Sequence, residues 1–155
     1  MIPPVDDLDR IMTVMARAFD PEFGEAWTRR QVEDALLLGN CHYALIGEAG
    51  LLPPPGDDAA GFSLSRYGFE EEELLLFAVD PAHRRKGLGQ CMLAGLATAA
   101  RARGARRLLL EMRRGNPAEI LYRAFGFHPI GERPNYYRTA SGTRIDAITF
   151  ACSIE

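Results

Sequence analysis

The residues best suited to chemistry lie in a short turn, where an apolar run ending at Val79 leads through Asp80 and Pro81 into a helical pattern. This turn comprises Arg84, Arg85, Lys86, Gly87, Leu88, Gly89 and Gln90. The first turn of a helix has unpaired backbone N–H groups and a partial positive charge, so it attracts anions. The two glycines have no side chains to hold an anion off the backbone, and the three basic residues add positive charge. We therefore predict that this turn binds a compact polyphosphate.

Two familiar phosphate motifs do not account for this turn. The chain contains no G-x-x-x-x-G-K-[ST] sequence, and Met92 stands where the third glycine of a G-x-G-x-x-G motif belongs. The surrounding residues 84–114 contain nine basic residues against one acidic residue, Glu111, in a chain of net charge −3. Nucleic acid is a poor fit, because the chain is acidic overall and aromatic residues are not interleaved with the basic ones. Four of the arginines have a second interpretation, that they only solvate a helix and its exit.

The turn follows V-x-P and fits the pattern [R/Q]-x-x-G-x-[G/A], which resembles the acyl-coenzyme A pyrophosphate loop of the GNAT superfamily of N-acetyltransferases. Downstream, Glu111, Asn116, Tyr122 and the segment 125–127 are similar in order and spacing to the second half of that superfamily's core. The resemblance implies an α/β fold with a mixed, mostly antiparallel central sheet flanked by helices, and acetyl-CoA as cosubstrate. It also implies coenzyme contacts at Phe77, Ala78, Val79, Asn116 and residues 84–90.

Three further segments resemble one subgroup, which acetylates the N-terminal alanine of a small-subunit ribosomal protein. They are Trp27-Thr28, the run from Arg133 to Tyr137, and Asp146-Ala147. This resemblance implies a protein N-terminus as the acceptor and Trp27, Tyr136 and Tyr137 as substrate-binding residues. We expect the tyrosine pair in a loop between two strands, where its flat faces suit a peptide backbone. A small-molecule or lysine side-chain acetyltransferase, or a non-catalytic acyl-CoA-binding regulatory module, remains an alternative.

Glu111 is the candidate proton acceptor. An amine attacks an acyl group only as the free base, yet an α-amino group has a pKa near 8 and is largely protonated at neutral pH. A carboxylate must therefore accept its proton, directly or through water. Glu111 stands at the end of the apolar run Leu108–Leu110, where partial burial suits this role. Alternatively, it is a strand-edge residue paired with a neighbouring arginine such as Arg113.

Tyr122 is the candidate proton donor. Coenzyme A leaves as a thiolate, whose aqueous pKa is about 8.5 like that of cysteine, so a hydroxyl at the sulfur would assist its departure. The alternative is core packing between Leu121 and Phe125 with the hydroxyl at the surface. A backbone N–H of Ala78 or Val79 would stabilise the oxyanion at the thioester carbonyl.

The hydrophobic spacing predicts the elements that must position these residues. The helices are expected at Val5–Phe19, Thr28–Gly39 with a Thr28–Gln31 capping box, Gly87–Arg103 and Pro117–Phe125. The strands are expected at Cys41–Glu48, Gly61–Tyr67, Leu74–Val79, Leu108–Leu110, Phe127–Glu132 and Thr143–Ile154. The acidic run Glu70–Glu73 is expected to be a solvated strand entry, or, less often, an attractor of a cationic substrate.

Length and composition indicate one domain over residues 1–155, with 47% hydrophobic and 25% charged residues. No apolar run approaches the roughly 20 residues that cross a bilayer, and the start lacks the parts of a signal peptide. We therefore expect a cytoplasmic protein that contacts no membrane. The three cysteines are widely spaced and are expected to be buried apolar side chains, and neither they nor the three scattered histidines predict a metal site. These cysteines are Cys41, Cys91 and Cys152.

Overall fold

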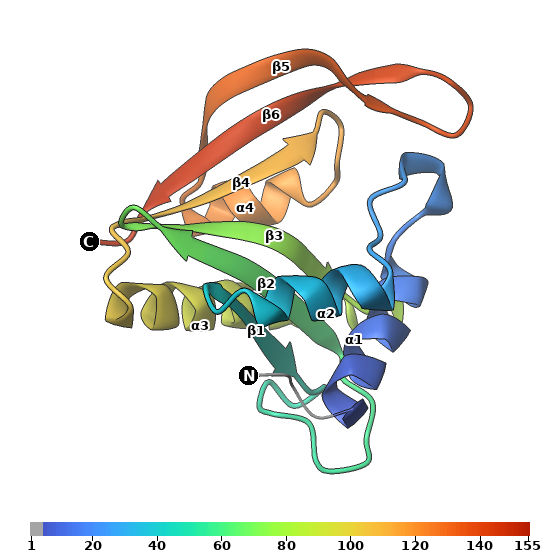
Figure 1. The fold of residues 1–155 in the computed structure, drawn as a ribbon, viewed down its shortest axis with the longest axis vertical. Helices are drawn as coiled ribbons and strands as arrows, with labels where there is room; N and C mark the ends of the chain where they lie inside the picture. The colour runs from blue at the N-terminus through green and yellow to red at the C-terminus, as the bar shows by residue number, and fades with distance from the viewer. Residues whose placement is uncertain (1–4) are drawn as a thin grey trace.

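The computed structural model describes residues 5–155 as a six-stranded sheet with helices on both faces (Figure 1). Its α-helices are α1 (Val5–Ala18), α2 (Arg29–Leu37), α3 (Leu88–Ala102) and α4 (Glu119–Phe125), with short 3₁₀ helices η1 (Pro21–Phe23) and η2 (Pro81–His83). Its strands are β1 (Cys41–Ile46), β2 (Gly61–Gly68), β3 (Glu71–Val79), β4 (Arg107–Arg113), β5 (His128–Arg138) and β6 (Arg144–Ser153). The spatial order is β1-β2-β3-β4-β6-β5, and only β3 and β4 pair in parallel. The predicted mixed, mostly antiparallel sheet with flanking helices is confirmed.

Local signals in the sequence define the helices well. The capping box that opens α2 is present in full, since the Thr28 hydroxyl accepts from the Gln31 N–H and the Gln31 side chain accepts from the Thr28 N–H. Gly87 takes the left-handed conformation immediately before α3, at φ +77°, which a side chain would disfavour. The Thr28–Gln31 capping box and Gly87 fix the directions in which α2 and α3 leave the preceding loops.

The core consists of two main hydrophobic clusters, one on each face of the sheet. Helices α1 and α2 bury Ile11, Val14 and Val32 against the β1–β3 half. Helices α3 and α4 bury Leu93 and Tyr122 against β4 and β6. Apolar area removed from water, at about 25 cal/mol per Å², is the main stabilising contribution to such a fold. The two clusters hold the central strands β3 and β4 from opposite sides.

A bulge in β3 opens the centre of the sheet. Leu64 of β2 pairs with Leu76, but the next residue, Ser65, pairs with Leu74, so Leu75 is an extra residue on β3. The bulge changes which face the side chains reach: Leu74 packs under α3 and α4, whereas Leu76 packs under α1 and α2. The pairing of β3 with β4 also ends at Leu74. Beyond this point the two parallel strands separate, and the site described below lies at their separation.

Four of the arginines in the basic segment pair with the protein itself. Arg103 contacts Glu72, Arg106 contacts Glu70 and Glu155, Arg107 contacts Glu71, and Arg101 donates to the Ile154 carbonyl. These arginines therefore do more than solvate a helix and its exit, because each has a partner within the protein. The acidic run does lie at the entry to β3, with Glu70, Glu71 and Glu73 at least partly exposed, but Glu72 departs from the expectation because its side chain is 0% exposed. Neutralisation by Arg103, with a hydrogen bond from Ser65, makes this burial possible.

Two other expectations are wrong. β5 does not end at Glu132 but runs to Arg138, so Tyr136 and Tyr137 lie within a strand and not in a loop. The strand continues because an irregularity between Arg133 and Tyr137 lets it stay paired with β6. Cys91 is exposed on α3, although Cys41 and Cys152 are buried as expected. Within residues 5–155, no helix is both long enough and apolar enough to cross a membrane.

Candidate active site

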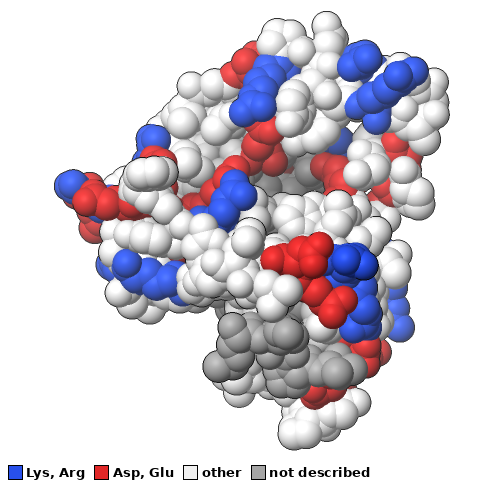
Figure 2. All heavy atoms as spheres, in the orientation of Figure 1, with Lys and Arg blue, Asp and Glu red and all other residues white. Residues whose placement is uncertain are grey.

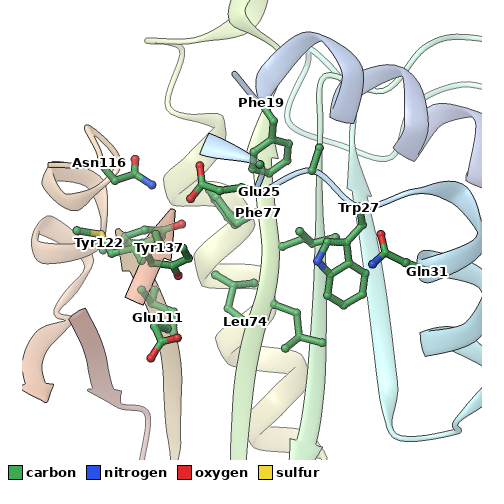
Figure 3. Close-up of a pocket in the computed structure, with 16 residues that line it drawn as sticks. Phe19, Glu25, Trp27, Gln31, Leu74, Phe77, Glu111, Asn116, Tyr122 and Tyr137 are labelled. Atoms are coloured by element: carbon green, nitrogen blue, oxygen red, sulfur yellow. The ribbon is translucent and has the colours of Figure 1, made fainter. Parts of the chain in front are cut away.

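A pocket of about 340 Å³ lies where β3 and β4 separate. Its wall combines residues from the α1–α2 loop, the centre of the sheet, α4 and β5 (Figure 3). The lining side chains used below are Glu25, Trp27, Phe77, Glu111, Asn116, Tyr122 and Tyr137. Figure 2 shows the molecule hollowed below β5 and β6, with acidic side chains at the hollow. The structure thus brings together residues that are up to 118 positions apart, from Phe19 to Tyr137.

Glu111 faces this pocket from β4, as predicted. Its side chain is 21% exposed, its Oε2 lies 3.3 Å from Nε of Arg133, and it accepts a 3.4 Å hydrogen bond from Thr149. Buried Leu110 and Met112 flank it on the opposite face of the strand, which fixes the direction of the carboxylate. The expected alternative partner, Arg113, binds another carboxylate. Glu111 is therefore held loosely by two neighbours and remains open to the pocket.

Tyr122 reaches the same pocket from α4. Its ring packs edge-on against Phe77 at 5.9 Å and Phe127 at 5.7 Å between centroids, so the side chain is both part of the core and part of the pocket wall. Within residues 5–155 its hydroxyl takes part in no hydrogen bond. Burial raises the pKa of Tyr122 above its ordinary value, and the nearby charge of Glu25 adds to this rise. The phenol accordingly stays protonated at working pH and can donate a proton.

Glu25 is a pocket residue that sequence reasoning missed. It lies between η1 and α2, and Figure 3 shows its carboxylate pointing toward the side that holds Asn116, Tyr122 and Tyr137. Burial raises the pKa of Glu25, and the coulombic attraction and hydrogen bond of Arg113 oppose this rise only in part. The only feature of the sequence that could have marked Glu25 as a pocket residue is its position two residues before Trp27. No local pattern separates Glu25 from Glu22, which lies in the same connection between α1 and α2.

The substrate-binding candidates separate into two groups. Trp27 and Tyr137 line the pocket, but Tyr136 does not and is 51% exposed. The Tyr136 ring packs edge-on against Tyr137 at 5.2 Å and carries the Arg133 guanidinium at 5.0 Å. Burial, followed by the charges of Glu111 and Glu25, raises the pKa of Tyr137 to about 12. Tyr137 therefore stands close to both carboxylates of the pocket.

The anion-binding turn lies at the start of α3, outside the pocket wall. Arg84 folds back to the carbonyls of Val79 and Ala18, and Lys86 lies 3.4 Å from His83. Arg85 makes no hydrogen bond or ion pair within the described chain, and its φ of +64° turns the backbone before Gly87. Leu88 is buried and Gln90 is exposed. Arg84, Arg85 and Lys86 form no ion pair with a carboxylate within residues 5–155, so positive charge is concentrated at this turn and at the α3 N-terminus.

Gly89 has a structural reason that differs from the predicted one. A Cβ at this position would lie 2.8 Å from Cδ2 of Leu121, so the glycine allows α3 to approach α4.

Of the other expected coenzyme contacts, Phe77 and Asn116 line the pocket, and Ala78 and Val79 do not. These two residues nevertheless continue β3 past its last pair with β4, so the β3 edge facing β4 has no partner strand there. An oxyanion could accept hydrogen bonds from this edge.

Asp80 fixes the entrance to the turn. Its carboxylate accepts from the Ala82 N–H at 2.9 Å and from Arg17 at 3.1 Å. Burial alone would raise the pKa of Asp80, but these two hydrogen bonds and the Arg17 charge hold it below its usual value.

No group of three or more His, Cys, Asp or Glu side chains in residues 5–155 is arranged to hold a metal ion.

Comparison with known proteins decides the family. The model of the acetyltransferase (GNAT) domain matches residues 39–129, which is more than half of the chain. The chain belongs to the GNAT acetyltransferase family. The crystal structure of the ribosomal-protein-S18-alanine N-acetyltransferase from Escherichia coli superposes on this GNAT protein with a TM-score of 0.81, covering 100% of this chain and 92% of that one at 29% identity.

Curated relatives of this GNAT protein carry a consistent name. The [ribosomal protein bS18]-alanine N-acetyltransferase of Escherichia coli (strain K12) is 41% identical over 96 residues, which are 61% of this chain and 64% of that protein. The match thus spans less than two thirds of the relative's length. An aminoglycoside 6'-N-acetyltransferase complexed with coenzyme A shares the fold at a TM-score of 0.75 and 16% identity, covering 98% of this chain and 93% of that one.

Proposed function

We propose that this GNAT protein transfers the acetyl group of acetyl-CoA to the N-terminal α-amino group of a protein, with a ribosomal protein that begins with alanine as the preferred acceptor. The observation that carries this proposal is the meeting of Glu111, Tyr122 and Tyr137 at one pocket, from three elements. The acceptor class is proposed from the similar proteins described above, which are ribosomal-protein-alanine N-acetyltransferases.

The cosubstrate is proposed to reach the pocket through the separation of β3 and β4. Its pyrophosphate would bind at residues 84–90, where Arg85 and the α3 N-terminus supply positive charge and N–H donors. Its pantetheine and acetyl portions would then follow the unpaired edge of β3 past Phe77 toward Tyr122. Asn116, at the far side of the pocket, is proposed as a further contact to the coenzyme.

The transfer would proceed directly from donor to acceptor. Glu111 accepts a proton from the substrate ammonium, and the free amine forms a C–N bond with the thioester carbon. The negative charge on the carbonyl oxygen is stabilised by N–H groups on the open edge of β3. As the C–S bond breaks, the sulfur takes the proton of the Tyr122 phenol, which the raised pKa keeps in place until that step.

The peptide would enter from the side formed by the α1–α2 loop and β5. Trp27 and Tyr137 offer apolar faces for the first residues of the peptide. A small pocket suits a small first side chain such as alanine, because a cavity of about 340 Å³ must also receive the acetyl group. The α1–α2 loop also contacts the tip of the β5–β6 hairpin, where the Glu22 carbonyl and carboxylate accept hydrogen bonds from the Ala140 and Ser141 N–H groups.

Intact-mass analysis tests the proposal directly. The protein is incubated with acetyl-CoA and with peptides that begin with Ala, Ser or Thr, alongside a polyamine and an aminoglycoside. We expect a gain of one acetyl group on the alanine peptide, and none on the same peptide with a blocked N-terminus. Robust acetylation of the small amines with none on any peptide would overturn the acceptor class.

A further inference from the structure

The pocket holds a second carboxylate for which the proposed reaction has not yet assigned a role. The Glu25 side chain is 20% exposed and lines the wall together with Glu111, although the two come from a loop and from the centre of the sheet. Both carboxylates influence the pKa of Tyr137, but among them only Glu25 influences that of Tyr122. In Figure 3 the Glu25 carboxylate points toward the side of the pocket that holds Tyr122, whose phenol is proposed to face the leaving group.

The chemistry of the acceptor requires two protons to leave one nitrogen. A substrate ammonium must lose one proton before attack, and the nitrogen of the tetrahedral intermediate must lose another before a neutral amide forms. The leaving sulfur regains only one proton. A single carboxylate that has already accepted the first proton cannot accept the second until it has released the first to solvent.

We propose that Glu25 is a second catalytic residue, which accepts the proton of the tetrahedral intermediate's nitrogen and returns it to Tyr122. In this sequence Glu111 takes the first proton, the C–N bond forms, and Glu25 takes the second proton as the C–S bond breaks. The thiolate takes the Tyr122 proton, Glu25 reprotonates the phenolate directly or through water, and Glu111 releases its proton to solvent. The products are one amide, one free thiol and one proton. This inference rests on the proposed acetyl transfer.

The surroundings of Glu25 suit this role. Arg113 of β4 holds the carboxylate at 3.4 Å and is itself fixed by the Phe23 ring, whose centroid lies 3.5 Å from the guanidinium carbon. The other titratable groups that face the pocket are Glu111, Tyr122 and Tyr137. Because burial outweighs Arg113, Glu25 is a stronger proton acceptor than an exposed carboxylate.

A purely structural role for Glu25 predicts a different response. A carboxyl with a pKa raised in the folded state contributes stability that is present below its unfolded pKa and is lost as pH rises through the folded value. At neutral pH the ionised, partly buried Glu25 therefore lowers the stability of the folded state, and its replacement with glutamine removes this loss of stability. We therefore expect Glu25→Gln to keep or raise the melting temperature while turnover falls, whereas loss of an essential structural ion pair would lower both.

The test compares the pH dependence of kcat for wild type, Glu25→Gln, Glu25→Asp, Arg113→Gln and the control Glu22→Gln. Glu22 lies on the same loop outside the pocket, and glutamine keeps the oxygen that accepts from the Ser141 N–H. We expect Glu25→Gln to lower kcat at neutral pH by about 10²-fold, with partial recovery in alkali and in the aspartate variant. Arg113→Gln should move the acid limb of the profile to higher pH, because the charge that lowers the pKa of Glu25 is lost.

Three results would overturn the inference. They are a kcat within a few-fold of wild type in Glu25→Gln, an equal loss in Glu22→Gln, or equal losses of kcat and melting temperature in Glu25→Gln and Arg113→Gln. If wild type acetylates a small amine and no peptide, the acceptor class fails, and the same variants are compared on that amine, which must also lose two protons. Wild type that acetylates no amine would overturn both proposals.

Discussion

Arg113 forms its ion pair with Glu25 across 88 residues of sequence, although Glu111 stands two positions away on the same strand. Alternate residues of a strand share a face, so Arg113 and Glu111 both point toward the α1–α2 side of the sheet. Glu111 is instead approached by Arg133 from β5. Each carboxylate therefore has its own arginine, and neither arginine neutralises both. This separation makes distinct roles for the two carboxylates chemically possible.

The first prediction concerns Glu111. Glu111→Gln should lower kcat by roughly 10²- to 10⁴-fold at neutral pH, as loss of a general base does, while the affinity for acetyl-CoA changes little. Steady-state kinetics and calorimetry measure these two quantities. Glu132→Gln is the matched control, since Glu132 lies on β5 and pairs with Arg114 outside the pocket. A fall of less than a few-fold, with no further recovery in alkali, would place proton acceptance elsewhere.

The second prediction concerns the Tyr122 hydroxyl. Tyr122→Phe keeps the ring contacts with Phe77 and Phe127, and the hydroxyl makes no hydrogen bond within residues 5–155. The melting temperature should therefore stay near that of wild type, whereas kcat should fall by about 10²-fold if the phenol protonates the thiolate. Because the pKa of Tyr122 is raised, the wild-type rate should not decline at pH values near the ordinary tyrosine pKa of about 10. A decline there that Tyr122→Phe removes would contradict the assigned pKa direction.

The parts of the molecule that follow from local chemistry could be read from the sequence. The capping pair Thr28 and Gln31 and the turn glycine Gly87 act within one turn of chain, so their residue types alone predict the helix starts. Glu111 and Tyr122 were predicted as base and acid because the chemistry of amine acylation requires both and the two residues stand at family-matched positions. Their meeting at one pocket agrees with that assignment.

Long-range packing decided the features that the sequence did not reveal. Glu72 looks like one of four solvated acids, and only the approach of Arg103 from the end of α3 makes its burial possible. Glu25 looks like a loop acid, and only the separation of β3 and β4 places a pocket beside it. The length of β5 depends on its pairing with β6 through an irregularity, which no periodicity in residues 133–137 indicates.

The third prediction concerns Arg85. Arg85→Glu should weaken acetyl-CoA binding by about tenfold or more, because a negative charge would replace a cation that pairs with no carboxylate within residues 5–155 and lies just before α3. Calorimetry at two salt concentrations measures the effect, which should shrink at high salt. Arg106→Glu is the control, since Arg106 pairs with Glu70 and Glu155 instead. Gly89→Asp is a less specific test, because its side chain would also meet Leu121. Equal acetyl-CoA affinities of wild type, Arg85→Glu and Arg106→Glu would remove the anion-site interpretation.

The fourth prediction concerns Asp80 and the pH dependence of stability. A carboxyl whose folded pKa is lowered contributes stability that is present above its unfolded pKa, about 3.9, and is lost as pH falls through the folded value. Asp80→Asn should therefore lower the melting temperature at pH 7, and the difference from wild type should narrow in acid. Asp58→Asn is the control, because Asp58 approaches the same Arg17 but is exposed. A difference that stays constant from pH 7 to pH 2 would contradict the lowered pKa.

The last prediction separates the two adjacent tyrosines. Tyr137 lines the pocket, whereas Tyr136 packs against it from outside and carries Arg133 on its ring. Tyr137→Ala should therefore raise the KM for an N-terminal peptide much more than the KM for acetyl-CoA, since only the peptide contact is lost.

Tyr136→Ala should have a smaller effect on the peptide KM, because its side chain acts only by supporting Tyr137. Tyr137→Phe keeps the ring and removes the hydroxyl, so it distinguishes an apolar contact from a hydrogen bond to the peptide backbone. Steady-state kinetics with each substrate in turn measures all three variants. A KM change in Tyr136→Ala as large as that in Tyr137→Ala would indicate that the pair acts as one surface. Equal weakening of peptide and acetyl-CoA in Tyr137→Ala would show that this wall serves the cosubstrate and not the acceptor.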